Sequence, residues 1–97
     1  MYEDYEDYNN EELDITLLKG VGVKDIEGGI KVMLMSNDDE IINTYNVMVD
    51  LSKLDDNKLC KVCYNISQRV FNLYYENNGE LTQNIVENAV RGEMMIL

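Results

Sequence analysis

The hydrophobic pattern of this 97-residue chain changes its period near residue 52, and that change limits the folds open to it. Before this point apolar residues alternate with polar ones, as in half-buried β-strands, and after it they recur with the spacing of amphipathic helices. Strands followed by helices predict an α+β fold: a three-stranded antiparallel β-meander followed by two α-helices that cover one face of the sheet. We expect strands at 13–26, 30–35 and 41–51 and helices at 53–76 and 80–91.

The predicted strands each present one apolar face to the core. Gly20 and Gly22 indicate a bulge or bend in the first strand, and Gly28 and Gly29 supply the hairpin before the second. The residues expected to face the core are Leu13, Ile15, Leu17, Val21 and Val23, then Ile30, Val32 and Leu34, then Ile41, Tyr45, Val47, Val49 and Leu51. The other face carries Met33, Met35, Ile42, Thr44 and Met48, and we expect it to be open or covered by the N-terminal segment.

The two predicted helices have recognisable ends. The first should begin at the capping box Ser52-Lys53-Leu54-Asp55 and stop at Asn77-Asn78-Gly79. The second should end at Gly92, and the apolar tail Met94 to Leu97 should close the core or form a short edge strand. The apolar helix faces comprise Leu59, Val62, Cys63, Ile66, Val70, Leu73 and Tyr74, and Leu81, Ile85, Val86, Ala89 and Val90.

Acidic residues are concentrated at the N-terminus. Residues 1–14 hold seven acids and no Lys or Arg, within a formal net charge of −11 for the chain. We therefore expect an acidic arm of Tyr, Asp and Glu at 1–12 and a single α+β domain at 13–97. This charge disfavours direct binding to nucleic acid or to anionic membranes and favours a basic partner. With no long apolar run and no signal peptide, the sequence predicts a soluble, cytoplasmic protein.

The residues that catalysis and metal binding need are absent or poorly placed. The chain has no His, so imidazole bases, histidine ligands and Ser-His-Asp relays are excluded. Cys60-Lys61-Val62-Cys63 has redox or zinc spacing, but it lies inside a predicted helix without further ligands, so we expect buried, reduced thiols. Lys19-Gly20-Val21-Gly22-Val23 lacks the third glycine and the helix of a dinucleotide loop. We predict no enzyme, cofactor or metal, with a thiol-dependent enzyme using the two cysteines as an alternative.

The acidic arm has a spacing that fits mimicry of nucleic acid. Its repeat, Tyr2-Glu3-Asp4 and Tyr5-Glu6-Asp7 followed by Tyr8, places about one charge per 4 Å of extended chain, near the 3.4 Å per phosphate of a DNA strand. The tyrosines would stack where bases lie or cover guanidinium groups. A solubilising tail is the alternative, and tyrosine kinases and sulfotransferases also prefer such sites. The predicted partner-binding residues are Tyr2, Glu3, Asp4, Tyr5, Glu6, Asp7, Tyr8, Glu11 and Glu12 in the arm and Asp38, Asp39 and Glu40 in the turn before the third strand.

In character the chain resembles the small, acidic, phage-encoded inhibitors that imitate nucleic acid, including anti-CRISPR proteins that act on CRISPR effector nucleases. The resemblance lies in the short length, the net charge of −11, the order of strands and helices and the Asn-rich composition. No single motif carries it. It implies a non-enzymatic inhibitor that acts in the cytoplasm of a bacterial host and occupies the nucleic-acid channel of a basic protein, such as the site that reads the PAM.

A homo-oligomeric structural or adaptor protein is the alternative function. Met33, Met35, Met48 and the tail from Met94 to Leu97 would then form an apolar, Met-rich interface between subunits, as in a homodimer.

Overall fold

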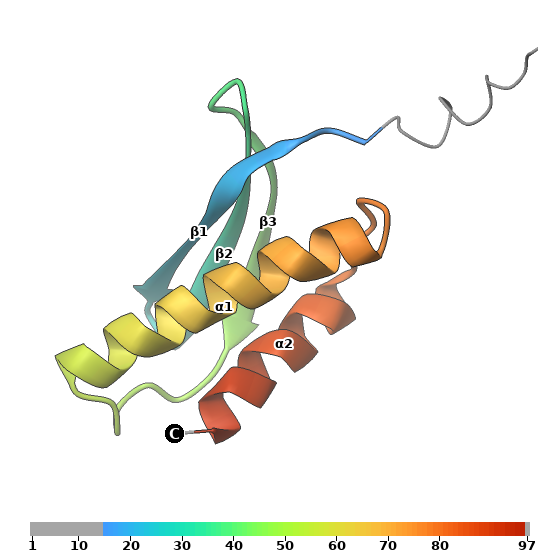
Figure 1. The fold of residues 1–97 in the computed structure, drawn as a ribbon. Coiled ribbons are helices and arrows are strands. Elements are labelled where there is room, and N and C mark those ends of the chain that lie inside the picture. The colour runs from blue at the N-terminus through green and yellow to red at the C-terminus, as the bar shows by residue number, and fades with distance from the viewer. Residues whose placement is uncertain (1–14, 97) are drawn as a thin grey trace, which may run out of the picture.

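The computed structural model describes residues 15–96, which form a three-stranded antiparallel sheet followed by two α-helices (Figure 1). The strands pair in sequence order, and both helices lie on one side of the sheet. The predicted α+β meander is therefore confirmed, while residues 1–14 and residue 97 lie outside the described range. The elements are β1 (Leu18–Ile26), β2 (Gly29–Ser36), β3 (Ile41–Met48), α1 (Asp56–Glu76) and α2 (Gln83–Met95).

The core lies between the sheet and the helices. Alternate residues of β2 are buried because their side chains point towards the helix layer, while the residues between them point away. The predicted apolar face of α1 is confirmed, with its central residues buried and those at its margins half-buried. The buried hydrophobic residues are Leu18, Ile30, Val32, Leu34, Tyr45, Val47, Val62, Ile66, Val70, Tyr74, Leu81, Val86, Ala89 and Val90.

The two glycines of the β1–β2 hairpin serve different purposes. Gly28 has a φ of +82°, a left-handed conformation that other residues adopt only with strain. Gly29 is buried, and a Cβ atom built on it would lie 2.1 Å from the carbonyl oxygen of Val47. The hairpin prediction is confirmed, and the second glycine permits the close approach of β3 rather than the turn itself.

Two register shifts alter which side chains reach the core. The shift at the start of β1 confirms the predicted bulge, but it buries Leu18 and leaves Leu17 57% exposed, so the prediction that Leu17 faces the core was wrong. The shift at the start of β3 pairs Ile41 with Met35, on the face away from the helices. Ile41 is 55% exposed, and its predicted place in the core was also wrong.

The connection from β3 to α1 is longer than predicted. β3 ends at Met48, and Val49 and Leu51 lie half-buried in the loop that follows it rather than within the strand. Both side chains pack against the core, as predicted. The prediction that Val49 and Leu51 belong to the third strand was wrong.

The N-cap of α1 is Asp55 and not Ser52. The Asp55 carboxylate accepts a hydrogen bond of 2.8 Å from the Lys58 N–H, satisfying an amide of the first turn. Ser52 instead donates to the carboxylate of Asp50 through its backbone N–H (3.0 Å) and its hydroxyl (2.7 Å). The predicted capping box therefore does not form, and α1 begins three residues later than predicted.

The second helix is displaced towards the C-terminus. Thr82 is its N-cap, and the helix continues through Gly92 instead of ending there. Met94 is half-buried in its last turn and packs against the core, whereas Met95 and Ile96 are 83% and 74% exposed. The described part of the tail therefore forms no edge strand, and only Met94 contributes to the core as predicted. Neither described helix has the length and apolar character needed to cross a membrane.

Side chains from both helices satisfy backbone groups at the sheet edges. The Ser67 hydroxyl donates to the Val21 carbonyl (2.7 Å), and the Tyr75 hydroxyl accepts from the Leu18 N–H (2.9 Å) on β1. The amide of Gln83 on α2 donates to a backbone carbonyl of β3 (2.8 Å). These contacts occupy edge positions that could otherwise pair with another strand.

Candidate partner-binding surface

The turn between β2 and β3 is organised by one buried serine. The side-chain oxygen of Ser36 accepts hydrogen bonds from the N–H groups of Asp38 (3.1 Å) and Glu40 (3.3 Å). The backbone N–H of Ser36 donates to the Glu40 carbonyl (2.8 Å), and its carbonyl accepts from the Asp39 N–H (3.0 Å). Ser36 and backbone carbonyls thus satisfy the amides of the turn. The carboxylates of Asp38, Asp39 and Glu40 take no part in these bonds, and all three residues are exposed.

One of the three carboxylates forms an ion pair. Lys19 at the start of β1 contacts Asp39, whose φ of 65° is a left-handed conformation that Asp and Asn tolerate better than most residues. Both side chains are largely exposed, so the pair contributes little to stability. Asp38 and Glu40 have no ion-pair partner among residues 15–96.

The first residues of β1 lie at the same end of the molecule as this turn. Leu18 pairs with Ser36 across the β1–β2 ladder. A Cβ atom built at Gly79 would come within 2.8 Å of Ile15, so the chain before β1 also passes against the α1–α2 connection. We name this region the acidic end; it is visible in Figure 1 where the chain enters β1, and its exposed acids are Asp38, Asp39, Glu40, Glu76 and Glu80.

The predicted partner-binding residues of the acidic arm lie outside the described residues. They are Tyr2, Glu3, Asp4, Tyr5, Glu6, Asp7, Tyr8, Glu11 and Glu12. The described residues show where the chain that follows the arm enters the domain. Because Ile15 lies at the acidic end, the arm and the acidic turn join the fold at the same end of the sheet.

Exposed apolar side chains lie at the acidic end, and two of the three were predicted to face the core. Leu17, just before β1, and Ile41 and Ile42, at the start of β3, are 57%, 55% and 40% exposed. Only Ile42 was predicted on the face away from the helices. A sequence signal was present, since adjacent apolar residues occur where the first and third strands begin, at Leu17-Leu18 and Ile41-Ile42, and neighbouring residues of a regular strand cannot both face the core. Exposed apolar side chains next to charged ones supply both the apolar area and the polar contacts that protein-binding surfaces use.

Charges at the opposite end of the sheet are mixed in sign. Around the β1–β2 hairpin and the beginning of α1, lysines alternate with acids, so neither sign dominates the surface. The acidic end is therefore distinguished by its excess of one sign. The lysines are Lys24, Lys31, Lys53, Lys58 and Lys61, and the acids are Asp25, Glu27, Asp50, Asp55 and Asp56.

The two cysteines do not form a reactive pair. Cys60 is exposed, so the prediction that both thiols are buried was wrong, and Cys63 is half-buried. Burial raises the pKa of the Cys63 thiol, and the nearby Asp25 and Cys60 raise it further, which keeps the thiol protonated at neutral pH. Among the described residues, no group of three or more His, Cys, Asp or Glu side chains could hold a metal ion.

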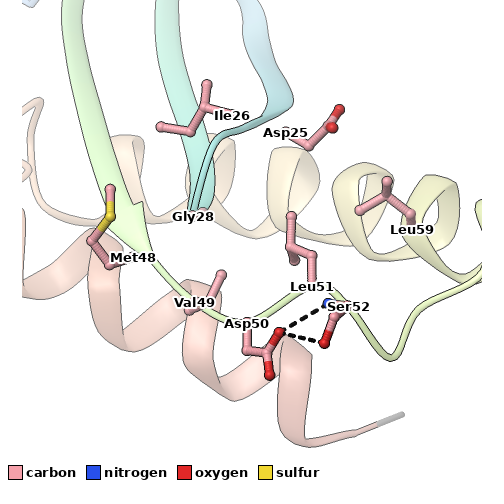
Figure 2. A pocket seen from close by; sticks show the side chains of 10 residues that line it. Asp25, Ile26, Gly28, Met48, Val49, Asp50, Leu51, Ser52 and Leu59 are labelled. Carbon is pink, nitrogen blue, oxygen red and sulfur yellow. Dashed lines mark hydrogen bonds between the residues drawn. The ribbon is translucent and has the colours of Figure 1, made fainter.

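A hollow of about 660 Å³ opens beside the β1–β2 hairpin, where the loop after β3 passes under the end of the sheet (Figure 2). Its polar groups are the carboxylates of Asp25 and Asp50 and the Ser52 hydroxyl. The hydrogen bonds from Ser52 lower the pKa of Asp50 and fix this carboxylate against the loop. Because its pKa is lowered, Asp50 is a weak base, and its hydrogen bond with the Ser52 hydroxyl holds the loop in place. The lining of the hollow is that of a loop packed on a core.

Comparison with protein-family models, with curated proteins and with solved structures gave no match to this chain.

Proposed function

We propose that this protein is a non-enzymatic inhibitor that binds a basic nucleic-acid-binding protein in the place of nucleic acid. The observation that carries the proposal is the position of the acidic turn beside the start of β1, the strand that follows the acidic arm in the sequence. The arm supplies most of the charge, through Glu3, Asp4, Glu6, Asp7, Glu11 and Glu12, and Asp38, Asp39 and Glu40 supply the rest.

The acidic end has the chemistry that such a partner requires. Its carboxylates are exposed and accept charge-assisted hydrogen bonds from Arg and Lys side chains that would otherwise bind phosphates. Leu17 and Ile41 beside them provide apolar area that binding would desolvate. CRISPR effector nucleases belong to this class of partner because they hold nucleic acid in a positively charged channel.

Displacement by DNA tests the proposal directly. The full chain is immobilised and exposed to a lysate of a bacterium that contains a CRISPR effector nuclease, and bound protein is eluted with salt or with soluble duplex DNA. We expect a retained protein that duplex DNA releases, and we expect the free chain to displace labelled DNA from that protein after purification. Retained proteins that neither DNA nor RNA displaces would contradict mimicry of nucleic acid.

A matched pair of variants localises the contact. The triple variant Asp38→Asn, Asp39→Asn, Glu40→Gln removes three charges at the acidic end and keeps a residue that tolerates the positive φ at position 39. The control, Asp25→Asn, Glu27→Gln, Asp56→Asn, removes three charges at the opposite end. We expect the first variant to elute at lower salt and the control to elute like the wild type, since screened charges act only over short distances. Equal shifts would mean that net charge alone governs binding.

The open Met-rich face supports homo-oligomerisation as a second candidate. Met33, Met35 and Met48 lie on the face of the sheet away from the helices, whereas Met94 and Met95 belong to α2 in the helix layer, so the two parts of the predicted interface are on different sides. Self-association would therefore use the open face alone. A dimer that persists in light scattering at high salt would favour this function over the first.

A further inference from the structure

Within residues 15–96, both helices lie on one side of the sheet, and no helix or strand covers its other face. Its side chains come from alternate residues of each strand, and we call it the open face. Met33 and Met35 are half-buried on it, while Met48 is 57% exposed. Over β1 the face is hollowed, because Gly20 and Gly22 contribute no side chains there. The open face comprises Gly20, Gly22, Lys24, Lys31, Met33, Met35, Ile41, Thr44, Asn46 and Met48.

The charges of the open face have the opposite sign to the rest of the protein. Lys24 and Lys31 are directly opposite each other in the β1–β2 ladder, and none of the ten residues of the open face is acidic. Like charges in directly opposed positions destabilise a sheet. Within residues 15–96 neither lysine has an acidic ion-pair partner, since the described ion pair joins Lys19 to Asp39. The open face therefore suits an anionic segment with apolar or aromatic side chains.

We propose that the acidic arm, residues 1–12 of the same chain, docks on the open face. Its carboxylates would lie near Lys24 and Lys31, and its tyrosines would cover the methionines, a favourable contact between sulfur and aromatic rings. The complementarity is specific to this pair of surfaces: the arm has acids and no bases, and the open face has bases and no acids.

The arm is long enough to reach this position. Twelve extended residues span about 40 Å, whereas an eight-residue strand such as β2 spans about 27 Å. The surplus of roughly 13 Å exceeds the spacing of about 10 Å between packed layers. This surplus is needed because Ile15 lies against the α1–α2 connection, so the arm must pass around the end of the sheet to reach the open face.

Other occupants fit the open face less well. A second copy packed face to face with its strands parallel would bring two pairs of Lys24 and Lys31 together, which repel each other, and an antiparallel copy would leave both lysine pairs without an anionic segment of the open face to meet. A separate acidic protein would compete against a segment whose tether gives it a high effective concentration at the surface. The docked arm does not rest on the proposed function, because it is a property of the isolated chain. A basic partner that binds the arm carboxylates would have to displace them from Lys24 and Lys31.

Zero-length cross-linking of carboxylates to amines in the full-length protein tests the docked position. Peptide mapping by mass spectrometry then identifies which lysines become joined to residues 1–12. We expect Lys24 and Lys31 to be joined several-fold more often than Lys53, Lys58 and Lys61, although these three are at least as exposed. An equal mixture of isotopically light and heavy chains shows whether each link lies within one molecule. Uniform linking of all lysines, no linking to Lys24 or Lys31, or links only between molecules would overturn the proposal.

Oxidation of methionines provides a second measurement on the same protein. Met95 is 83% exposed on α2 and serves as the internal reference. In the variant Lys24→Glu, Lys31→Glu we expect Met33 and Met35 to oxidise several-fold faster relative to Met95, because the reversed charges repel the arm. The control variant Lys58→Glu, Lys61→Glu should oxidise like the wild type. If the first variant is unfolded by circular dichroism, Lys24→Gln with Lys31→Gln replaces it, and unchanged protection of Met33 and Met35 in a folded variant would contradict docking.

Discussion

The two faces of the sheet are built from the same three strands but differ in almost every physical respect. Towards the helices, Ile30, Val32 and Val47 are fully buried and aliphatic. On the open face, Met33 is half-buried between strands that carry lysines, glycines, Thr44 and Asn46. The covered face is constrained by packing, whereas residues of the open face can change without creating cavities. The sequence of the open face is therefore the better indicator of what the protein binds.

Truncation of neighbouring residues on β2 gives the largest expected contrast between the faces. Leu34 is 2% exposed, so Leu34→Ala should lower the free energy of unfolding by about 3–5 kcal/mol through lost burial and a residual cavity. Met35→Ala, on the half-buried opposite face, should cost about 1 kcal/mol or less. Urea unfolding followed by circular dichroism measures both. Similar costs would mean that the open face is packed as tightly as the core.

Removing a buried hydroxyl should have an intermediate effect. The Tyr45 hydroxyl donates to the Leu81 carbonyl (2.7 Å) and accepts from the Asn43 amide (2.9 Å), which ties β3 to the residue before the N-cap of α2. Tyr45→Phe leaves that carbonyl without its partner in the core and should cost about 1–3 kcal/mol. Tyr64→Phe is the control, because Tyr64 is 65% exposed and its loss should change stability by less than about 0.5 kcal/mol.

The pH dependence of the same variant checks the mechanism. Burial raises the pKa of Tyr45, so the folded state favours the neutral hydroxyl. Its contribution to stability is present below the unfolded value of about 10 and is lost as the pH rises through the higher folded pKa. The difference in unfolding free energy between wild type and Tyr45→Phe should thus be constant from neutral pH to about pH 10 and shrink above it. A difference that grows with alkaline pH would contradict this assignment.

The fold was predictable because its main signals are periodic. The change from alternation to helical spacing specified the meander and both helices, and Ile66 and Val70 lie in the predicted centre of the α1 face. The ends were less predictable because short polar side chains compete for the same amides. Ser52 was the predicted cap of α1, but Asp50 binds its hydroxyl and leaves Asp55 to cap the helix.

The candidate site was predictable only in part. Exposure of Asp38 to Glu40 followed from the polar turn, but nothing in the sequence states that Leu18 pairs with Ser36 and so puts the turn beside the chain's entry into β1. Single-residue register shifts move side chains from one face of a sheet to the other. For this reason Ile41 was predicted in the core but is exposed, and of the apolar residues at the acidic end only Ile42 was predicted outside the core.

The smallest expected effect has the opposite sign and probes the glycines of the open face. A Cβ atom at Gly20 would meet nothing within 4 Å, and Gly20 does not have a positive φ. Gly20→Ala should therefore stabilise the protein by about 0.4–1 kcal/mol, because it reduces the conformational entropy of the unfolded chain without strain in the fold. A Cβ atom at Gly22 would lie 3.3 Å from the terminal methyl of Met33, so Gly22→Ala should gain less, since that methyl must move. Urea midpoints with unchanged slopes measure both. If Gly20→Ala destabilises the protein more than Gly22→Ala does, then the start of β1 is sterically crowded, and the open face resembles the covered face in its packing at that point.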